Sequence, residues 1–161
     1  GAINVKSEPG RGTVFDILLP KVTLERVSEG ESHTLPSVKN RRILIVDDEE
    51  ALVNVVENVL CDFGYRVVGK TDSVEAMQLF RQIPEQFDLV IADCTMPRIS
   101  GMELAEEMMT IRPDIPIILY TGFNESVNRE TAVAMGIRDL LMKPISVSEL
   151  TGMVDKLLSN H

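Results

Sequence analysis

The stretch ILIVDD at residues 43–48 joins a short apolar run to two adjacent acids, and this arrangement decides the reading of the chain. Three later apolar runs likewise end in a polar residue: LVIA before Asp93, IILY before Thr121 and LLM before Lys143. Short apolar runs are typical of parallel strands that are buried on both faces. Because ligands bind outside the carboxyl ends of the strands in an open α/β sheet, we expect these polar residues to share one edge.

The chain from residue 41 onward alternates between strand and helix patterns. Strands are expected over residues 42–47, 66–70, 88–93, 115–121 and 138–143. Helices are expected over residues 49–62, 74–83, 101–111, 125–135 and 147–159. Five such βα units predict a parallel sheet with right-handed crossovers and helices on both faces.

The first 40 residues have a different pattern. Residues 1–20 alternate apolar and polar side chains on both sides of Pro9-Gly10-Arg11-Gly12, which predicts a β-hairpin. A lone hairpin is marginally stable in water, so we expect this one either to dock on the α/β domain or to belong to another domain. Without its parent sheet we expect it to be loosely held. Residues 21–40 are poor in apolar side chains and are predicted to be a linker.

Composition restricts the classes of function. The net charge is −9, and residues 41–161 carry all of the imbalance, with 11 basic against 20 acidic side chains. Such an acidic domain argues against nucleic-acid binding and fits a divalent cation or a basic partner surface. Apolar runs are far shorter than the roughly 20 residues that cross a bilayer, so no membrane contact is expected from this fragment. The chain starts at Gly1 rather than Met, and we expect it to be a piece of a longer protein.

The two cysteines, Cys61 and Cys94, are too few for a disulfide framework and lack the spacing of a metal motif. We expect both to be reduced core thiols in a cytoplasmic protein.

The acidic residues at the strand ends predict a magnesium site. Acids at the start of a helix also stabilise its first turn, which accounts for Glu49 and Glu50. Capping does not explain two acids directly after a buried strand and a third after its neighbour, because clustered carboxylates repel unless a cation joins them. Mg²⁺ binds few carboxylates and keeps several waters. The expected direct ligands are Asp48 and Asp93, and Asp47 is expected to bind directly or through water. A backbone carbonyl near Thr95 is expected to add another oxygen.

Three side chains of this edge suit phosphoryl chemistry. A carboxylate such as Asp93 can act as a nucleophile and form an acyl phosphate. The hydroxyl of Thr121 can donate to a phosphoryl oxygen, and Lys143 supplies a point charge that suits an anion. Pro144 restricts Lys143 to an extended backbone. Each feature alone has an ordinary explanation in capping, turns or solvated charge, and only their combination indicates a site.

This combination resembles the receiver domain of two-component response regulators over residues 41–161. The resemblance implies a flavodoxin-like (βα)5 fold, doubly wound, with strand order 2-1-3-4-5. It implies that Asp93 accepts a phosphoryl group from a histidine kinase phosphotransfer domain or a histidine phosphotransfer protein. Asp47, Asp48 and Asp93 then hold Mg²⁺ while Lys143 contacts the phosphoryl group and Thr121 senses it. The resemblance implies that such a fragment is a switch that gains and loses phosphate and not a turnover enzyme. We expect it to be a monomer or a weak dimer.

One position departs from the family pattern. Receiver domains usually carry an aromatic residue three positions before the lysine, where this chain has Leu140. Tyr120 and Phe123 flank Thr121 without occupying that position. The resemblance therefore does not extend to the aromatic residue that usually couples to the threonine.

Residues 1–20 resemble the last hairpin of a histidine-kinase ATP-binding domain. The resemblance rests on GAINVKSEPGRGTVF at residues 1–15 and on Leu19-Pro20. The glycine-rich nucleotide boxes and the phosphoaccepting helix of that family are absent. The order of the pieces implies the end of a hybrid sensor kinase with its attached receiver, whose parent chain is a histidine protein kinase and can be membrane-anchored.

Two other functions stay open at this point. A phosphatase of the haloacid dehalogenase type also uses an aspartate nucleophile with Mg²⁺, but its acidic pair comes late in the chain rather than early. A degenerate receiver that serves only as a docking module is the other alternative. Turnover of an aryl phosphate favours the first of these, and failure to bind Mg²⁺ favours the second.

Overall fold

A computed structural model describes residues 2–18, 40–122 and 129–159 of the chain. Two compact units divide between residues 34 and 35, inside the segment that was predicted as a linker. Apart from Asn40, that segment lies outside the described residues, and so does Phe123.

The first unit contains the predicted hairpin. Strand β1 (Ala2–Glu8) pairs antiparallel with β2 (Gly12–Leu18) around a turn that contains Gly10, whose φ is 77°. Positive φ of this kind favours glycine because it has no Cβ. The register places Ile3 opposite Ile17, so one face of the hairpin is apolar.

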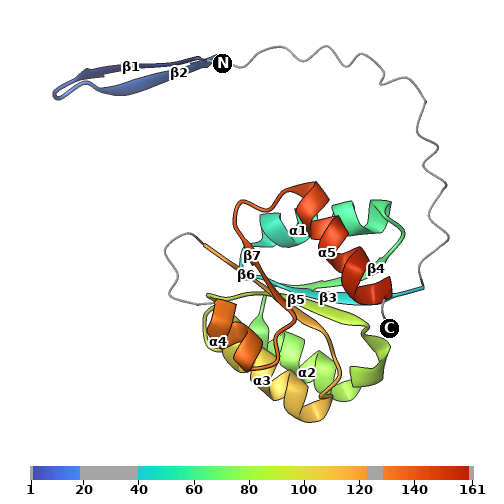
Figure 1. Cartoon of the computed structure of the whole chain (residues 1–161). Helices are drawn as coiled ribbons and strands as arrows, with labels where there is room; N and C mark the ends of the chain where they lie inside the picture. Colours follow the sequence, from blue (N-terminus) through green and yellow to red (C-terminus); the bar gives the residue numbers. More distant parts are fainter. Residues whose placement is uncertain (1, 19–39, 123–128, 160–161) are drawn as a thin grey trace, which may run out of the picture. The chain divides into compact units, whose positions relative to one another are not determined.

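The second unit is built on one five-stranded parallel sheet. Its strands are β3 (Arg42–Val46), β4 (Arg66–Lys70), β5 (Leu89–Asp93), β6 (Ile117–Thr121) and β7 (Asp139–Met142). They lie in the order β4-β3-β5-β6-β7 (Figure 1), and every neighbouring pair is parallel. Numbered within this unit alone, the order is 2-1-3-4-5, which confirms the predicted flavodoxin-like fold.

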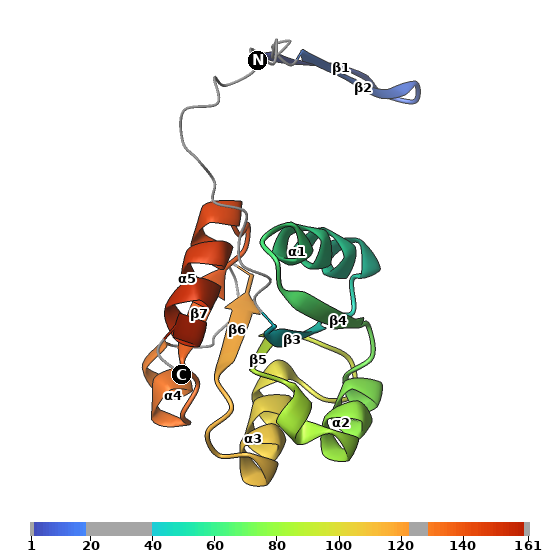
Figure 2. The same ribbon diagram turned by 90° about the vertical axis from the view of Figure 1, so that its right-hand side faces the viewer.

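Helices cover both faces of this sheet. Figures 1 and 2 show α1 (Glu50–Asp62) and α5 (Val147–Ser159) on one face. The opposite face carries α2 (Ser73–Gln82), α3 (Gly101–Ile111) and α4 (Arg129–Ala134). The helix predicted over residues 125–135 is thus seen from residue 129, since 125–128 lie outside the described residues, and a short 3-10 helix at Pro84–Gln86 was not predicted. No helix in the described part of the chain combines the length and apolarity needed to cross a bilayer.

Two apolar cores follow from the alternation of side chains along the strands. Ile45, Ile91 and Ile118 pack with α1 and α5 in one cluster. Their neighbours Leu44, Val90 and Leu119 pack with α2 and α3 in the other cluster. All six are fully buried. The sheet is therefore rigidly held from both sides up to the ends of its strands.

Local sequence signals fix where several helices begin. Asp72 accepts hydrogen bonds from the backbone N–H groups of Val74 and Glu75, as its position before α2 predicts. Ser146 and Glu149 form a capping box at the start of α5.

Candidate functional site

The carboxyl ends of β3 and β5 bring three acids together. Asp47 follows β3 and is completely buried, Asp93 ends β5 and is 4% exposed, and Asp48 is exposed. One carboxylate oxygen from each lies within 4.8 Å of the others. Two buried acids so close together need a nearby positive charge, since like charges in a poorly solvated place repel strongly.

Lys143 supplies that charge from the end of β7. Its Nζ lies 2.8 Å from Oδ1 of Asp93 and 3.2 Å from Oδ2 of Asp47. Burial would lower the pKa of Lys143, but the hydrogen bond to Asp93 and the charges of Asp47 and Asp93 outweigh burial, so that pKa is raised. Lys143 therefore stays an ammonium and ties the ends of three strands together.

Tyr120 lies beneath this ammonium. The Nζ of Lys143 is 4.7 Å from the centroid of the Tyr120 ring, and the Tyr120 hydroxyl donates to the Val46 carbonyl at 3.5 Å. Burial, then the charge of Asp47, raises the pKa of Tyr120, so the hydroxyl keeps its proton. The sequence reasoning noted Tyr120 only as a neighbour of Thr121. Its alternation with Ile118, which packs under α1 and α5, is the signal that could have found it.

Thr121 ends β6 at the same edge of the sheet. It is 3% exposed, and its hydroxyl donates to the Gly122 carbonyl at 3.3 Å. Thr95 is exposed two residues after Asp93, and a role for its carbonyl as a metal ligand stays a prediction. The structure thus places Asp47, Asp48, Asp93, Thr121 and Lys143 where strand ends were expected to put them.

The loop after Asp93 is closed by a tight backbone approach. The N–H of Gly101 donates to the Cys94 carbonyl at 3.0 Å, and a Cβ at Gly101 would lie 2.1 Å from the Asp93 carbonyl oxygen. Only glycine fits there without a shift of α3. Sequence reasoning missed this contact, which holds the start of α3 against the end of β5.

The prediction of two core thiols is wrong for one cysteine. Cys94 is buried beside Asp93, as expected, but Cys61 lies exposed near the end of α1. The apolar stripe of α1 turns Val56 and Leu60 toward the sheet, and Cys61 follows on the outer side.

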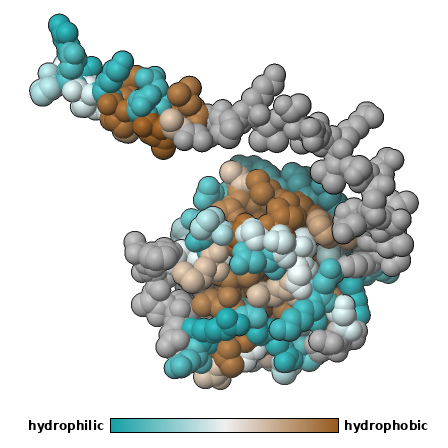
Figure 3. All heavy atoms as spheres, turned by 45° about the horizontal axis from the view of Figure 1, so that its top comes forward, coloured by the Kyte–Doolittle hydropathy of each residue, from teal (hydrophilic) through white to brown (hydrophobic). Residues whose placement is uncertain are grey.

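An apolar groove of about 490 Å³ runs between α1 and α5 and reaches the site. Its walls include Val55 and Val59 from α1 and Val147 from α5, and Lys143 also lines it. Val55 is 61% exposed and Val147 is 52% exposed. Figure 3 shows hydrophobic surface gathered on the side that carries these two helices.

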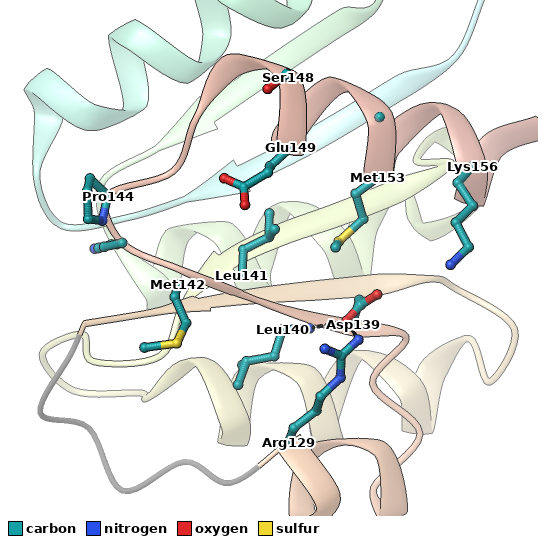
Figure 4. A pocket seen from close by; sticks show the side chains of 12 residues that line it. Arg129, Asp139, Leu140, Leu141, Met142, Pro144, Ser148, Glu149, Met153 and Lys156 are labelled. Atoms are coloured by element: carbon teal, nitrogen blue, oxygen red, sulfur yellow. Dashed lines mark hydrogen bonds and ion pairs between the residues drawn. The ribbon is translucent and has the colours of Figure 1, made fainter.

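A second hollow, of about 780 Å³, lies between β7, α4 and α5 (Figure 4). Arg129 forms an ion pair with Asp139 beside it. Figure 4 shows Leu140 and Leu141 pointing to opposite sides of β7. Leu140 packs against the core on the α2 and α3 side, so the position that receiver domains usually fill with an aromatic holds an aliphatic side chain here.

Known proteins resemble both the second unit and the whole chain. A probable transcriptional regulator, ycf27, of Cyanophora paradoxa is 34% identical over 75% of this chain and 49% of its own length. The sensor kinase CckA of Brucella abortus is 28% identical over 100% of this chain and 18% of its own length. The chain therefore spans about half or less of these relatives.

A solved structure and a family model also match this chain. A response regulator receiver domain protein from Clostridium thermocellum superposes with a TM-score of 0.71 at 28% identity, covering 74% of this chain and 95% of that one. The response regulator receiver domain model matches residues 43–155. The site described above lies within that range. The chain thus belongs to the response regulator receiver domain family, whose members serve as phosphoacceptors in two-component signalling.

Proposed function

We propose that Asp93 is the residue that accepts the phosphoryl group. The observation that carries this proposal is the ammonium of Lys143, 2.8 Å from Asp93 and 3.2 Å from Asp47 at the end of the sheet. A buried carboxylate beside a fixed cation can attack phosphorus while the cation meets the phosphoryl oxygens. An Asp93 oxygen forms the new bond to phosphorus, the bond from phosphorus to the donor's histidine nitrogen breaks, and that nitrogen keeps the electron pair.

The acidic residues fit a magnesium ion. Asp47, Asp48 and Asp93 offer hard oxygen atoms within 4.8 Å of one another, and the Thr95 carbonyl is a further candidate ligand. Three carboxylates and few other ligands match the preference of Mg²⁺ for a small number of carboxylates with several waters. When bound, Mg²⁺ supplies neutralisation of charge on the phosphoryl oxygens. The Thr121 hydroxyl then donates a hydrogen bond to a phosphoryl oxygen. This contact couples phosphorylation of Asp93 to the surface of the domain.

The proposed donor is a phosphohistidine on a histidine kinase phosphotransfer domain or a histidine phosphotransfer protein. Lys143 lines the apolar groove between α1 and α5, so a protein that delivers phosphate to Asp93 from this side covers the groove. Exposed Val55 and Val147 provide apolar contact for such a partner. We therefore assign the groove to the phosphodonor protein.

The proposed parent protein is a hybrid sensor histidine kinase. Residues 1–20 would be the last hairpin of its ATP-binding domain, residues 21–40 a linker and residues 41–161 the attached receiver. Two observations support this order: the similarity to the sensor kinase CckA extends over the whole chain, and the apolar side chains of the hairpin are left exposed. We place the receiver in the cytoplasm, as a monomer or weak dimer.

Intact mass after incubation with acetyl phosphate tests the acceptor. We expect one phosphate adduct that requires Mg²⁺ and is absent in Asp93→Asn. Normal adduct formation in Asp93→Asn would overturn the assignment. Absence of any adduct in the unmodified chain, together with failure to bind Mg²⁺ at millimolar concentration, would favour a docking module.

A pair of surface variants tests the donor surface. Val55→Asp places a charge in the groove, whereas Val133→Asp places one at a similarly exposed position on α4. With a phosphorylated histidine phosphotransfer domain as donor, we expect Val55→Asp to slow transfer about tenfold and Val133→Asp to leave it unchanged. Acetyl phosphate should modify both at the normal rate. Equal transfer to both variants would remove the groove from the docking surface.

A further inference from the structure

Four polar side chains at the strand ends extend a single face of the sheet. Alternation from Ile45 leads to Asp47, and alternation from Ile91 leads to Asp93. In the same way Ile118 leads to Tyr120, and Leu141 leads to Lys143. These apolar predecessors all belong to the core under α1 and α5. Tyr120 itself is a member of that core. It lies level with Asp93 along the sheet and level with Leu141, two residues before Lys143.

The Tyr120 ring is held by both strands that carry those acids. Its backbone carbonyl accepts from the Cys94 N–H at 2.9 Å, and Tyr120 pairs with Asp93 in the register of β5 and β6. Its hydroxyl reaches across β5 to the Val46 carbonyl, directly before Asp47. The side chain is 0% exposed. Because these contacts fix the ring, the ring cannot move with the Lys143 side chain. The position of the Lys143 ammonium is therefore set against the ring.

The face of this ring supports the Lys143 ammonium. The 4.7 Å between Nζ and the ring centroid is within the range of about 6 Å over which an aromatic face attracts a cation. The ring lies against one side of the ammonium, whose Nζ is also 3.2 Å from Asp47 and 2.8 Å from Asp93.

We propose that Tyr120 is a positioning residue, and that its ring holds the Lys143 ammonium where it meets the incoming phosphoryl oxygen. This inference rests on the proposed function of Asp93 and Lys143 and adds a residue to it. Leu140 cannot take this part, because it packs on the opposite side of β7 (Figure 4). The aromatic support in this receiver therefore lies on the lysine side of the sheet.

Three variants separate the ring from the hydroxyl and from general packing. Tyr120→Phe keeps the ring and loses the hydroxyl with its hydrogen bond to the Val46 carbonyl, while Tyr120→Leu removes the ring. Phe80→Leu truncates an equally buried aromatic in the other core, which makes it a matched control for lost stability. The readouts are the rate of phosphorylation by acetyl phosphate and the chemical shifts of the Lys143 side-chain protons, which a ring beneath the ammonium moves upfield.

We expect Tyr120→Leu to slow phosphorylation at least tenfold, since a misplaced catalytic group costs this much or more. It should also abolish the upfield shift, whereas Tyr120→Phe keeps the shift and most of the rate, and Phe80→Leu keeps both. A Lys143 shift that does not change in Tyr120→Leu, or equal losses of rate in all three variants, would overturn the proposal. Failure of the unmodified chain to take up phosphate would contradict the proposed function, and the shifts would still decide whether the ring supports Lys143.

Discussion

The hairpin and the five-stranded sheet use the same kinds of apolar residue but bury them differently. Phe15 and Ile17 in β2 are 64% and 61% exposed, whereas Ile91 and Ile118 in the large sheet are fully buried. The large sheet has helices on both faces, whereas the described residues of the hairpin's own unit form two strands and no helix.

The helices on both faces of the large sheet also shield the acidic edge from solvent. Asp47 and Asp93 can be nearly free of solvent only because packed helices flank the strands that carry them. In that setting the attraction to Lys143 is far stronger than between exposed groups such as Arg11 and Glu8 in the hairpin unit. An ion pair between a basic and an acidic side chain therefore stabilises the second unit more than it stabilises the hairpin unit.

The largest contrast is expected when one isoleucine is truncated in each unit. Ile118→Ala removes a fully buried side chain from the large sheet and should lower the free energy of unfolding by about 2–5 kcal/mol. Ile17→Ala removes a side chain that is mostly in water, so we expect a change below about 0.5 kcal/mol. Urea unfolding followed by circular dichroism measures both. Similar losses in the two variants would show that the hairpin is covered in solution.

Removal of the ammonium tests the buried ion pairs. Lys143→Met leaves Asp47 and Asp93 without their cation and should destabilise the unit by about 2–3 kcal/mol at neutral pH. The pKa of Lys143 is raised in the folded state above its ordinary 10.5. The stabilisation by the ammonium is therefore complete below pH 10.5 and is lost as the pH rises through the folded value.

Urea unfolding of the unmodified chain and of Lys143→Met, at pH values from 7 to 11.5, measures this difference. We expect the gap between the two to stay constant up to pH 10.5 and to narrow above it. A gap that widens with alkalinity would contradict the ion-pair account. Addition of Mg²⁺ should narrow the gap at neutral pH, since it replaces the lost positive charge.

Two glycines test the close approach behind Asp93. Gly101→Ala puts a Cβ 2.1 Å from the Asp93 carbonyl, so α3 must move, at a cost of about 1–3 kcal/mol and with slower phosphorylation. Gly152→Ala in α5 meets nothing within 4 Å and should stabilise the helix by up to about 1 kcal/mol. Thermal unfolding and acetyl phosphate kinetics are the measurements, and normal kinetics in Gly101→Ala would show that the loop tolerates the shift.

The smallest expected contrast concerns two exposed serines. Ser146→Ala removes the cap of α5 and should cost about 1 kcal/mol in urea unfolding. Ser7→Ala removes a side-chain hydrogen bond to Thr13 in the hairpin and should leave the free energy of unfolding of the second unit unchanged. A loss in Ser7→Ala comparable to that in Ser146→Ala would mean that the two units unfold together.

Sequence reasoning located most of the fold because apolar runs and caps are local signals. The five strands and the hairpin were expected from these signals, and the strand order from the resemblance to receiver domains. The structure shows the strands within two residues of the expected limits. The 3-10 helix at Pro84–Gln86 was missed because its pattern is only one turn long. Cys61 was misplaced because it was assigned to the core by residue type, although it lies beside the apolar stripe of α1 and not on it.

The sequence by itself determined that Asp47, Asp48, Asp93, Thr121 and Lys143 share one edge, because parallel strands end on the same side of their sheet. Only the tertiary structure decided which of these groups touch. The contact of Lys143 with both buried acids, the Tyr120 ring beneath it and the fit of Gly101 against Asp93 each join segments distant along the chain. Such contacts depend on the packing of whole helices and strands, and no local pattern of residues encodes them.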